Sequence, residues 1–172
     1  MLLEPLPPDR ELPAPLLAEL TGLFASNRAF HRISGDFPDP DDVRPDQVAA
    51  VLAEELATPG AEALTARTAA GERLVGIAVT LARHPDPADP DPWIGLLMVH
   101  ADAQGRGHGR ALATAVEERF RAQGRTAVRL AVLAANPRAL AFWTALGYVH
   151  LADRTDRTHG RPCAVLRKAL HP

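Results

Sequence analysis

The sequence contains a single cysteine, a single lysine and a single tyrosine, and only 5% of its residues are aromatic. One cysteine cannot form an internal disulfide, and no cluster of Cys and His has zinc-binding spacing, so a disulfide scaffold and a zinc module are both excluded. No run approaches the ~20 apolar residues of a membrane-spanning helix. The first residues lack the basic segment and apolar run of a secretory signal. We therefore expect a reduced, cytoplasmic protein with no metal and no membrane partner.

The net charge of −2 hides a separation of charge along the chain. Residues 1–103 hold 7 Arg against 17 Asp and Glu, which gives −10. Residues 104–172 hold 11 Arg and 1 Lys against 4 Asp and Glu, which gives +8. This asymmetry predicts two surfaces with different partners, one of them anionic. The excess of Arg over Lys, together with abundant Ala, is typical of a GC-rich bacterial genome.

Hydrophobic periodicity predicts a single α/β domain over residues 1–172. The proline-rich start leaves room only for a short edge strand. Helices are expected over residues 16–30 and 48–56, with a loop at 31–42 between them, then from a glycine-rich turn to Gly124, and over 137–147. Strands are expected over residues 61–69 and 73–83, which form a hairpin around Gly71, and over 93–99, 126–133, 148–151 and 163–166. The predicted order is β-α-α-β-β-β-α-β-α-β-β.

The most informative stretch covers residues 99–112, where a buried strand leads into a helix. Gly105, Gly107 and Gly109 occupy every second position, which lets the backbone adopt unusual torsions and approach a ligand closely. The N-terminus of the following helix offers free N–H groups and the positive end of its dipole to an anion. Positive charge around the turn comes from Arg106, His108 and Arg110. The stretch therefore predicts a pyrophosphate-binding site.

Two common nucleotide-binding patterns do not fit this stretch. A dinucleotide fingerprint requires a third glycine at the position of Arg110, and an acidic residue about 20 positions further on, where this chain is basic. A P-loop requires a lysine after its second glycine, but the only lysine is Lys168.

Two motifs resemble those of the GNAT superfamily of acetyl-CoA-dependent N-acetyltransferases. Gln104-Gly105-Arg106-Gly107-His108-Gly109 matches the family's [Q/R]-x-x-G-x-[G/A] signature. Downstream, Asn136-x-x-Ala139-x-x-Phe142-Trp143-x-x-Leu146-Gly147-Tyr148 is similar to its N-x-x-A-x-x-F-Y-x-x-x-G-[FY] pattern. The resemblance implies a mixed, mostly antiparallel central sheet with helices on both faces. It covers an acyl-CoA-binding core at about residues 61–168 well and the acceptor-side helices, at about 16–58, loosely.

The resemblance also implies roles for individual residues, with acetyl-CoA as cosubstrate. The strand that ends at Met98 and Val99 would lie beside the pantetheine arm, and one of its N–H groups would polarise the thioester carbonyl. Asn136 would meet the cofactor near the pantetheine, and Trp143 would line the same site. The residues implied to hold the pyrophosphate are Gln104, Gly105, Arg106, Gly107, His108, Gly109 and Arg110.

The chain departs from the family at the residues that move protons. Trp143 stands where many members carry a tyrosine as the general acid, and an indole N–H can only donate a hydrogen bond. Tyr148 and water are the alternative proton donors, and strand 93–99 carries no carboxylate that could act as base. The loop that the resemblance places over the acceptor offers His31 and Asp36 as candidate bases.

These observations predict transfer of an acetyl group from acetyl-CoA to a primary amine of a small cationic molecule, by direct attack in a ternary complex. The acidic part of the chain would attract the amine, while Arg106, Arg110 and Arg138 would face the phosphates of CoA. Two alternatives stay open, a non-catalytic acyl-CoA-binding or sensor domain and a protein N-terminal or lysine acetyltransferase. No nucleic-acid partner is expected, and a homodimer stays open.

Overall fold

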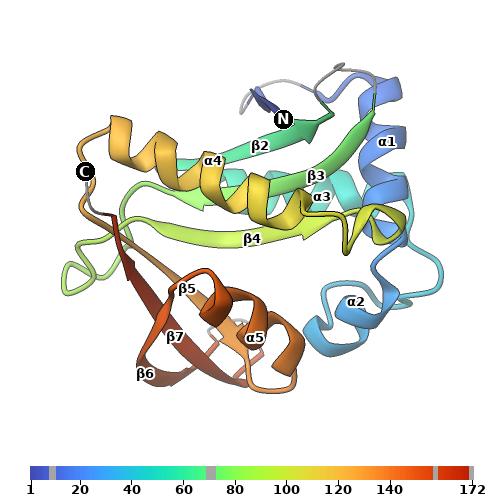
Figure 1. Ribbon diagram of the computed structural model, residues 1–172. Coiled ribbons are helices and arrows are strands. Elements are labelled where there is room, and N and C mark those ends of the chain that lie inside the picture. Colours follow the sequence, from blue (N-terminus) through green and yellow to red (C-terminus); the bar gives the residue numbers. More distant parts are fainter. Residues whose placement is uncertain (8–10, 69–72, 157–158, 171–172) are drawn as a thin grey trace.

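The computed structural model describes residues 1–7, 11–68, 73–156 and 159–170, and its centre is a seven-stranded sheet (Figure 1). The strands lie in the order β1-β2-β3-β4-β5-β7-β6. Every neighbouring pair is antiparallel except β4 and β5. The bounds are β1 (Leu2–Pro5), β2 (Ala61–Arg67), β3 (Leu74–Leu81), β4 (Trp93–Val99), β5 (Ala127–Leu133), β6 (Val149–Thr155) and β7 (Pro162–Ala169).

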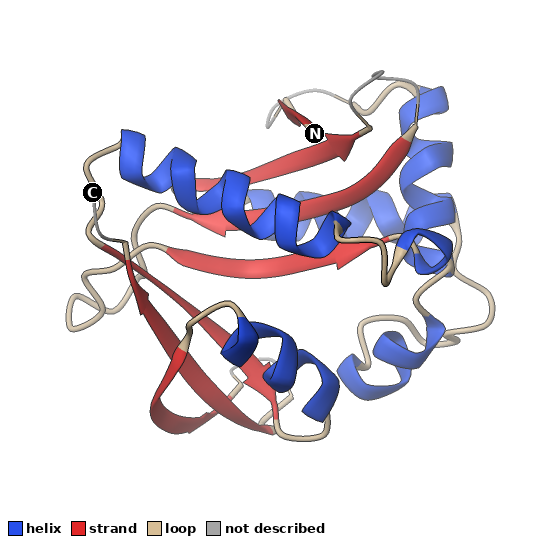
Figure 2. Ribbon diagram, in the orientation of Figure 1, coloured by secondary structure: helices blue, strands red, loops and turns tan. Residues whose placement is uncertain are grey.

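Helices cover both faces of this sheet, as Figure 2 shows. They are α1 (Ala14–Ala25), α2 (Arg28–Ser34), α3 (Pro45–Leu56), α4 (His108–Ala122) and α5 (Pro137–Ala145), with a short 3-10 turn over Ala101–Ala103. One cluster of buried side chains lies under α4 and α5, and a second lies under α1 and α3. The predicted fold, a mixed and mostly antiparallel sheet with helices on both faces, is confirmed. In the described part of the chain, no helix has the length and hydropathy needed to span a membrane.

The expected helix over residues 16–30 divides into α1 and α2 at Ser26 and Asn27, which is a correction to the predicted order. The Asn27 side-chain amide donates to the carbonyl of Leu23 (2.9 Å) and to that of Val99 at the end of β4 (3.2 Å). The Ser26 hydroxyl accepts from the N–H of Ala101 (3.0 Å). The break is therefore made by contacts with a distant strand, which helical periodicity cannot reveal. Helix α2 then continues through residues 31–34, which were expected to be loop.

The edges of the sheet agree with the predictions in position but differ in length. Strand β1 is the short edge strand expected at the proline-rich start. Strands β6 and β7 extend beyond the predicted 148–151 and 163–166. Nearly every side chain of β6 is exposed at the edge, so its sequence shows no apolar alternation that would mark its length. The predicted turn at Gly71 lies outside the described residues.

The feature that creates the site is the separation of β4 from β5. These parallel strands pair at the start of β4 only, and Ile94 and Leu130 form the last pair. Beyond it they diverge, and the gap is visible at the centre of the sheet in Figure 1. The next residue, Gly95, has no partner on β3 and forms a bulge, which bends the strand away from a regular path.

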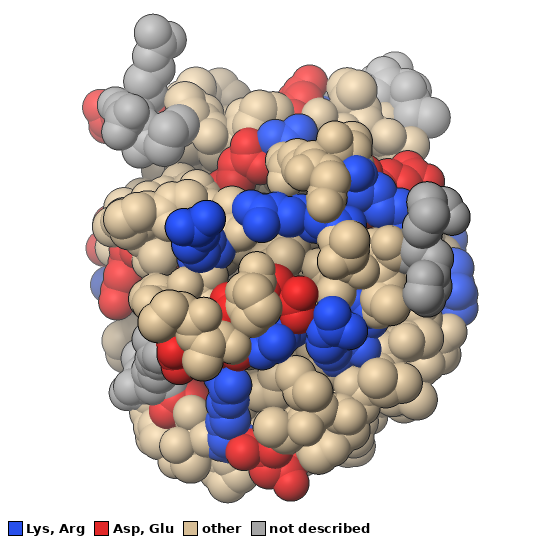
Figure 3. Space-filling model, turned by 90° about the vertical axis from the view of Figure 1, so that its left-hand side faces the viewer, with Lys and Arg blue, Asp and Glu red and all other residues tan. Residues whose placement is uncertain are grey.

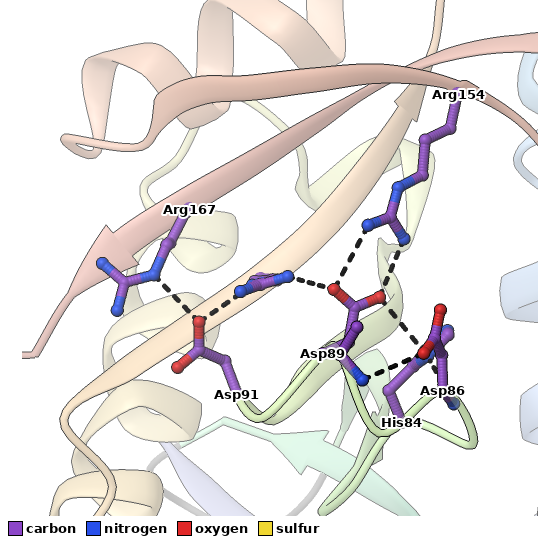
Figure 4. Close-up of polar contacts among 8 residues, drawn as sticks. His84, Asp86, Asp89, Asp91, Arg154 and Arg167 are labelled. Atoms are coloured by element: carbon purple, nitrogen blue, oxygen red, sulfur yellow. Dashed lines mark hydrogen bonds and ion pairs between the residues drawn. The ribbon is translucent and has the colours of Figure 1, made fainter.

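Charged side chains join the two parts of the sheet at the closed end of this split. Asp89 and Asp91 lie in the proline-rich connector between β3 and β4 (Figure 4). Asp89 accepts hydrogen bonds from Arg129 on β5 and from Arg154 on β6. Asp91 accepts from Arg129 (2.8 Å) and from Arg167 on β7 (2.9 Å). The connector is thus attached to all three strands on the far side of the split.

Candidate active site

A cavity of about 630 Å³ opens where β4 and β5 part. Residues 94–98 of β4 form one wall, and residues 130–133 of β5 form the wall that faces it. On the α5 side of the sheet the cavity is lined by Asn136 and Trp143, and on the α3 side by Leu52. The split therefore forms a passage through the sheet that connects its two helical layers.

Strand β4 presents unpaired backbone groups to this passage. The N–H of His100 donates to the Val75 carbonyl on β3 (2.9 Å). Because backbone groups alternate in direction along a strand, those of Val99 and Leu97 point away from β3, toward the open edge. The Val99 carbonyl accepts from the side chains of Asn27 and Gln104. The N–H and carbonyl of Leu97 remain on the open edge, where β5 no longer pairs with β4.

The glycine-rich turn has the backbone geometry that its sequence predicts. Gly105 and Gly107 have φ values of 74° and 85°, in the left-handed region where side chains with a Cβ are strained. No described atom lies within 4 Å of the place where a Cβ on either residue would stand, so the turn faces open space. A Cβ on Gly109, in the first turn of α4, would lie 3.4 Å from the Phe142 ring of α5. The turn thus brings the N-terminus of α4 beside α5 and leaves its own outer side open.

Three arginines near this turn are exposed and form no ion pair with any residue that the structure describes. They are Arg106, Arg110 and, in the first turn of α5, Arg138. Most other basic side chains of the C-terminal part pair with carboxylates: Arg119, Arg121, Arg129, Arg154, Arg161, Arg167 and Lys168. Figure 3, which views the C-terminal end of α4, shows basic and acidic side chains interleaved there. The charge separation along the sequence is therefore only partly a separation in space.

Gln104 uses its side chain to anchor the turn. Its amide nitrogen donates to the Asn27 side-chain oxygen (2.9 Å) and to the Val99 carbonyl (3.0 Å). Since Asn27 lies between α1 and α2, this pair of hydrogen bonds ties the glycine-rich turn to the acceptor-side helices. His108 follows as the half-buried first residue of α4.

Asn136 and Trp143 both line the cavity from the side of α5. The Asn136 side-chain oxygen accepts from the Ala139 N–H (3.1 Å), so it caps α5. Its amide nitrogen has no hydrogen-bond partner among the described residues. Trp143 is 7% exposed, and its ring packs edge-on against Phe142 (5.0 Å) and Tyr148 (4.9 Å).

Three carboxylates line the cavity on the side of α2 and α3. Asp36 follows α2, and Glu54 and Glu55 are near the end of α3. Glu55 is exposed at the end of α3. Neighbouring protein atoms still displace part of the water around its carboxyl group, and the charges of Asp36 and Glu54 add to this effect, so the pKa of Glu55 is raised. Across the cavity, Arg161 pairs with Asp156 and donates to the Ile33 carbonyl (2.8 Å). This last bond joins the turn before β7 to α2 at the edge of the cavity.

The structure places His31 and Tyr148 in the core, and neither is among the residues that line the cavity. His31 is 1% exposed, its Nε2 lies 2.9 Å from the Phe24 carbonyl, and its ring packs edge-on against Phe37. Burial lowers the pKa of His31, so the ring is kept neutral. Tyr148 is also 1% exposed, and burial together with the nearby Glu117 carboxylate raises its pKa well above the usual range.

From the sequence, Asp36 was named as a candidate site residue, but Glu54, Glu55 and Leu97 were not. The sequence carries a local signal for the two glutamates. Carboxylates in the last turn of a helix interact unfavourably with its dipole, so their position there indicates another role. The sequence carries no such signal for Leu97, because only its backbone N–H and carbonyl contribute to the site. No three His, Cys, Asp or Glu side chains of the described residues gather into a metal-binding group.

Comparison with known proteins agrees with this geometry. The model of the acetyltransferase (GNAT) family matches residues 27–148. The chain belongs to the GNAT acetyltransferase family. A search among curated proteins finds no match.

Solved structures show the same GNAT fold over nearly the whole chain. An acetyltransferase from Thermus thermophilus has a TM-score of 0.71 and 22% identity, covering 98% of this chain and 97% of its own. Spermidine N-acetyltransferase from Vibrio cholerae, in complex with CoA and spermine, has a TM-score of 0.68 and 14% identity, covering 98% and 95%. The ribosomal-protein-S18-alanine N-acetyltransferase from Escherichia coli has a TM-score of 0.65 and 17% identity, covering 99% and 96%. At these identities the likeness establishes the fold.

Proposed function

We propose that this GNAT protein transfers an acetyl group from acetyl-CoA to a primary amine of a small cationic molecule, within a ternary complex. The observation that carries the proposal is the passage through the sheet. One side of it is lined by Asn136, Ala139 and Trp143, and the other by Asp36, Glu54 and Glu55. A thioester at the split would be within reach of an ammonium group held by these carboxylates.

The residues around the turn fit a CoA molecule. Free N–H groups at the start of α4, with Arg106 and Arg110, suit the pyrophosphate. The open-edge groups of Leu97 and the N–H of Val99 suit the amides and thioester of the pantetheine arm, and the free amide of Asn136 lies on the same passage. The open space above Gly105 and Gly107 leaves room for the phosphates. A protein with this fold has been solved in complex with CoA, which supports CoA as the ligand.

Glu55 is the side chain that we assign as general base, in preference to His31, which lies in the core. The amine nitrogen attacks the thioester carbonyl carbon, a C–N bond forms, and the C–S bond breaks. Glu55 accepts the proton that the nitrogen loses, and its raised pKa makes it a stronger base than an ordinary carboxylate. Asp36 and Glu54 hold positive charge on the acceptor. The leaving thiolate takes its proton from water, since Tyr148 lies in the core.

The experiment is to incubate the protein with acetyl-CoA and a panel of monoamines, polyamines and aminoglycosides, and to follow free thiol and product mass. Acetylated amine above the rate of hydrolysis supports the proposal. Acetyl-CoA binding without turnover of any acceptor favours the sensor, which the absence of a tyrosine from the described cavity wall would explain. Mass shifts confined to peptides favour protein acetylation.

A further inference from the structure

A second cavity, of about 140 Å³, adjoins the main one and shares part of its wall. The shared residues are Glu55, Thr58 and Gly95. From this junction the side cavity extends to Trp93 at the start of β4, away from the glycine-rich turn. Glu55 therefore stands where the two cavities meet.

The walls of the side cavity differ chemically from those of the main cavity. Ala61, Val79 and Leu81 supply apolar side chains from β2 and β3. The Trp93 indole lies 5.1 Å from the His84 ring, between ring centres, and both rings line the cavity. An apolar cavity of about 150 Å³ holds a benzene molecule. The side cavity thus has room for a phenyl ring or an alkyl chain of similar size.

We propose that the side cavity is an acceptor subsite for a short alkyl or aryl group, while Glu55 at the junction binds the nitrogen that carries it. The inference rests on the proposed function and narrows its substrate class to monoamines with an apolar group of up to about six carbons, the size of the benzene molecule that such a cavity holds. A second ammonium group in this subsite would have to leave water for apolar walls, which is strongly unfavourable. Polyamines are therefore disfavoured in this orientation.

The first test compares acceptors that differ only in the group expected to occupy the subsite. From ethylamine to pentylamine, kcat/KM should rise about fourfold for each added methylene group, the value expected for burial of one CH₂. Pentylamine and 1,4-diaminobutane have nearly the same length, but one ends in a methyl group and the other in an ammonium group. Pentylamine should be the better acceptor by at least tenfold. Equal values for ethylamine and pentylamine, or a better diamine, would overturn the proposal.

The second test fills the subsite. Ala61→Leu places a larger side chain in the side cavity, so it should lower kcat/KM for pentylamine at least tenfold and leave that for ethylamine unchanged. The matched control is Ala57→Leu, since Ala57 is exposed at the end of α3 and lines neither cavity. Equal losses for both amines in Ala61→Leu would show that the variant damages the whole site and would contradict a separate subsite.

A binding measurement separates this inference from the proposed function. Calorimetry measures pentylamine binding to the wild-type protein and to Ala61→Leu, each saturated with CoA. Binding that Ala61→Leu weakens, without acetylation of any amine, would support the subsite and refute the acetyltransferase proposal. Acetylation of ethylamine and pentylamine at equal rates, with no effect of Ala61→Leu on binding, would refute the subsite and leave the proposed function intact.

Discussion

The role of general base that we propose for Glu55 depends on the environment of its side chain. Glu55 lies in the last turn of α3, borders both cavities, and shares its surroundings with the carboxylates of Asp36 and Glu54. The same crowding that raises the pKa of Glu55 also creates a negative potential for an incoming ammonium ion. A general base must be ionised to act, so activity should fall as the pH falls through this raised pKa.

Glu55→Gln should lower kcat/KM at pH 7 by at least about 10²-fold, a typical contribution of general base catalysis. It should also remove the acidic limb of the pH profile. Glu54→Gln is the matched control, because Glu54 is the adjacent carboxylate and lines the main cavity only. Glu54→Gln should lower kcat/KM less than tenfold and keep the acidic limb of the pH profile. That limb should shift to lower pH, because one negative charge near Glu55 is removed. His84 borders the side cavity, so a limb that survives in Glu55→Gln would point to another titrating group.

Some residues of the site could be predicted from sequence because their signals are local. The alternating glycines and the Asn136-Pro137 cap act within one turn. Gly105 and Gly107 have the expected left-handed torsions and Asn136 caps α5, whereas Gly109 has an ordinary helical conformation. His31 was a reasonable candidate base by residue type, but the surrounding phenylalanine rings bury it. Leu97 could not be found, since only the pairing of β4 with its neighbours decides which backbone groups are free.

At the scale of elements, the glycine-rich turn and the N-terminus of α4 together form the phosphate site that we propose. The two ends of α4 are bordered by glycines of similar geometry: Gly107, with a φ of 85°, precedes the helix and Gly124, with a φ of 75°, follows it. A Cβ on either glycine would meet no described atom within 4 Å. Gly107 and Gly124 therefore have similar backbone conformations but lie at opposite ends of α4.

Gly107→Ala and Gly124→Ala should each destabilise the protein by about 1 to 2 kcal/mol, the cost of a left-handed conformation for a residue with a Cβ. Only Gly107→Ala should weaken CoA binding, by at least tenfold, because its Cβ and the shifted backbone occupy the phosphate side of the turn. Thermal unfolding and calorimetry with CoA measure the two effects separately. Equal CoA affinity in the two variants would remove the turn from the cofactor site.

The division of the expected helix 16–30 shows why other elements escape prediction. Periodicity describes one helix face, whereas the break at Asn27 is set by hydrogen bonds to Val99 and Gln104, more than 70 positions later in the chain. In the same way, β6 extends through residues that an edge strand leaves exposed. Local pattern predicts where elements begin to form, and long-range contacts decide where they end.

At the scale of the whole molecule, ion pairs join the two parts of the sheet across the split, in addition to the hydrophobic core that they share. The side chain of Asp89 is 1% exposed and receives hydrogen bonds from two strands on the far side. The hydrogen bond from Arg154 outweighs burial and holds the pKa of Asp89 below its usual range. A carboxyl whose pKa is lower in the folded protein stabilises the fold above its unfolded pKa, near 4, and loses this effect as the pH falls.

Asp89→Asn should therefore destabilise the protein at pH 7 by about 3 kcal/mol, because it removes a buried carboxylate that pairs with both Arg129 and Arg154. For a chain of this size that lowers Tm by roughly 6 to 12 °C. The difference in Tm from wild type should shrink as the pH falls below about 4, because the unfolded wild-type chain then binds a proton at Asp89 that the folded protein binds only at lower pH. The control is Asp153→Asn, at an 84% exposed side chain on β6, which should change Tm little at any pH. Equal effects of the two variants on Tm would contradict a role of Asp89 in joining the two parts of the sheet.

The short pairing of β4 with β5 has a consequence for hydrogen exchange. Amides at the centre of a sheet are normally the slowest to exchange, because they are protected by hydrogen bonds on both sides. Here the amides of Leu97 and Val99 lie in the central strand but face an edge with no partner strand. They should exchange with deuterium faster than the amides of Leu96 and Met98, which point toward β3, and CoA should slow them selectively. Two backbone positions in the middle of the protein would then report whether the cofactor is bound, before any acceptor is known.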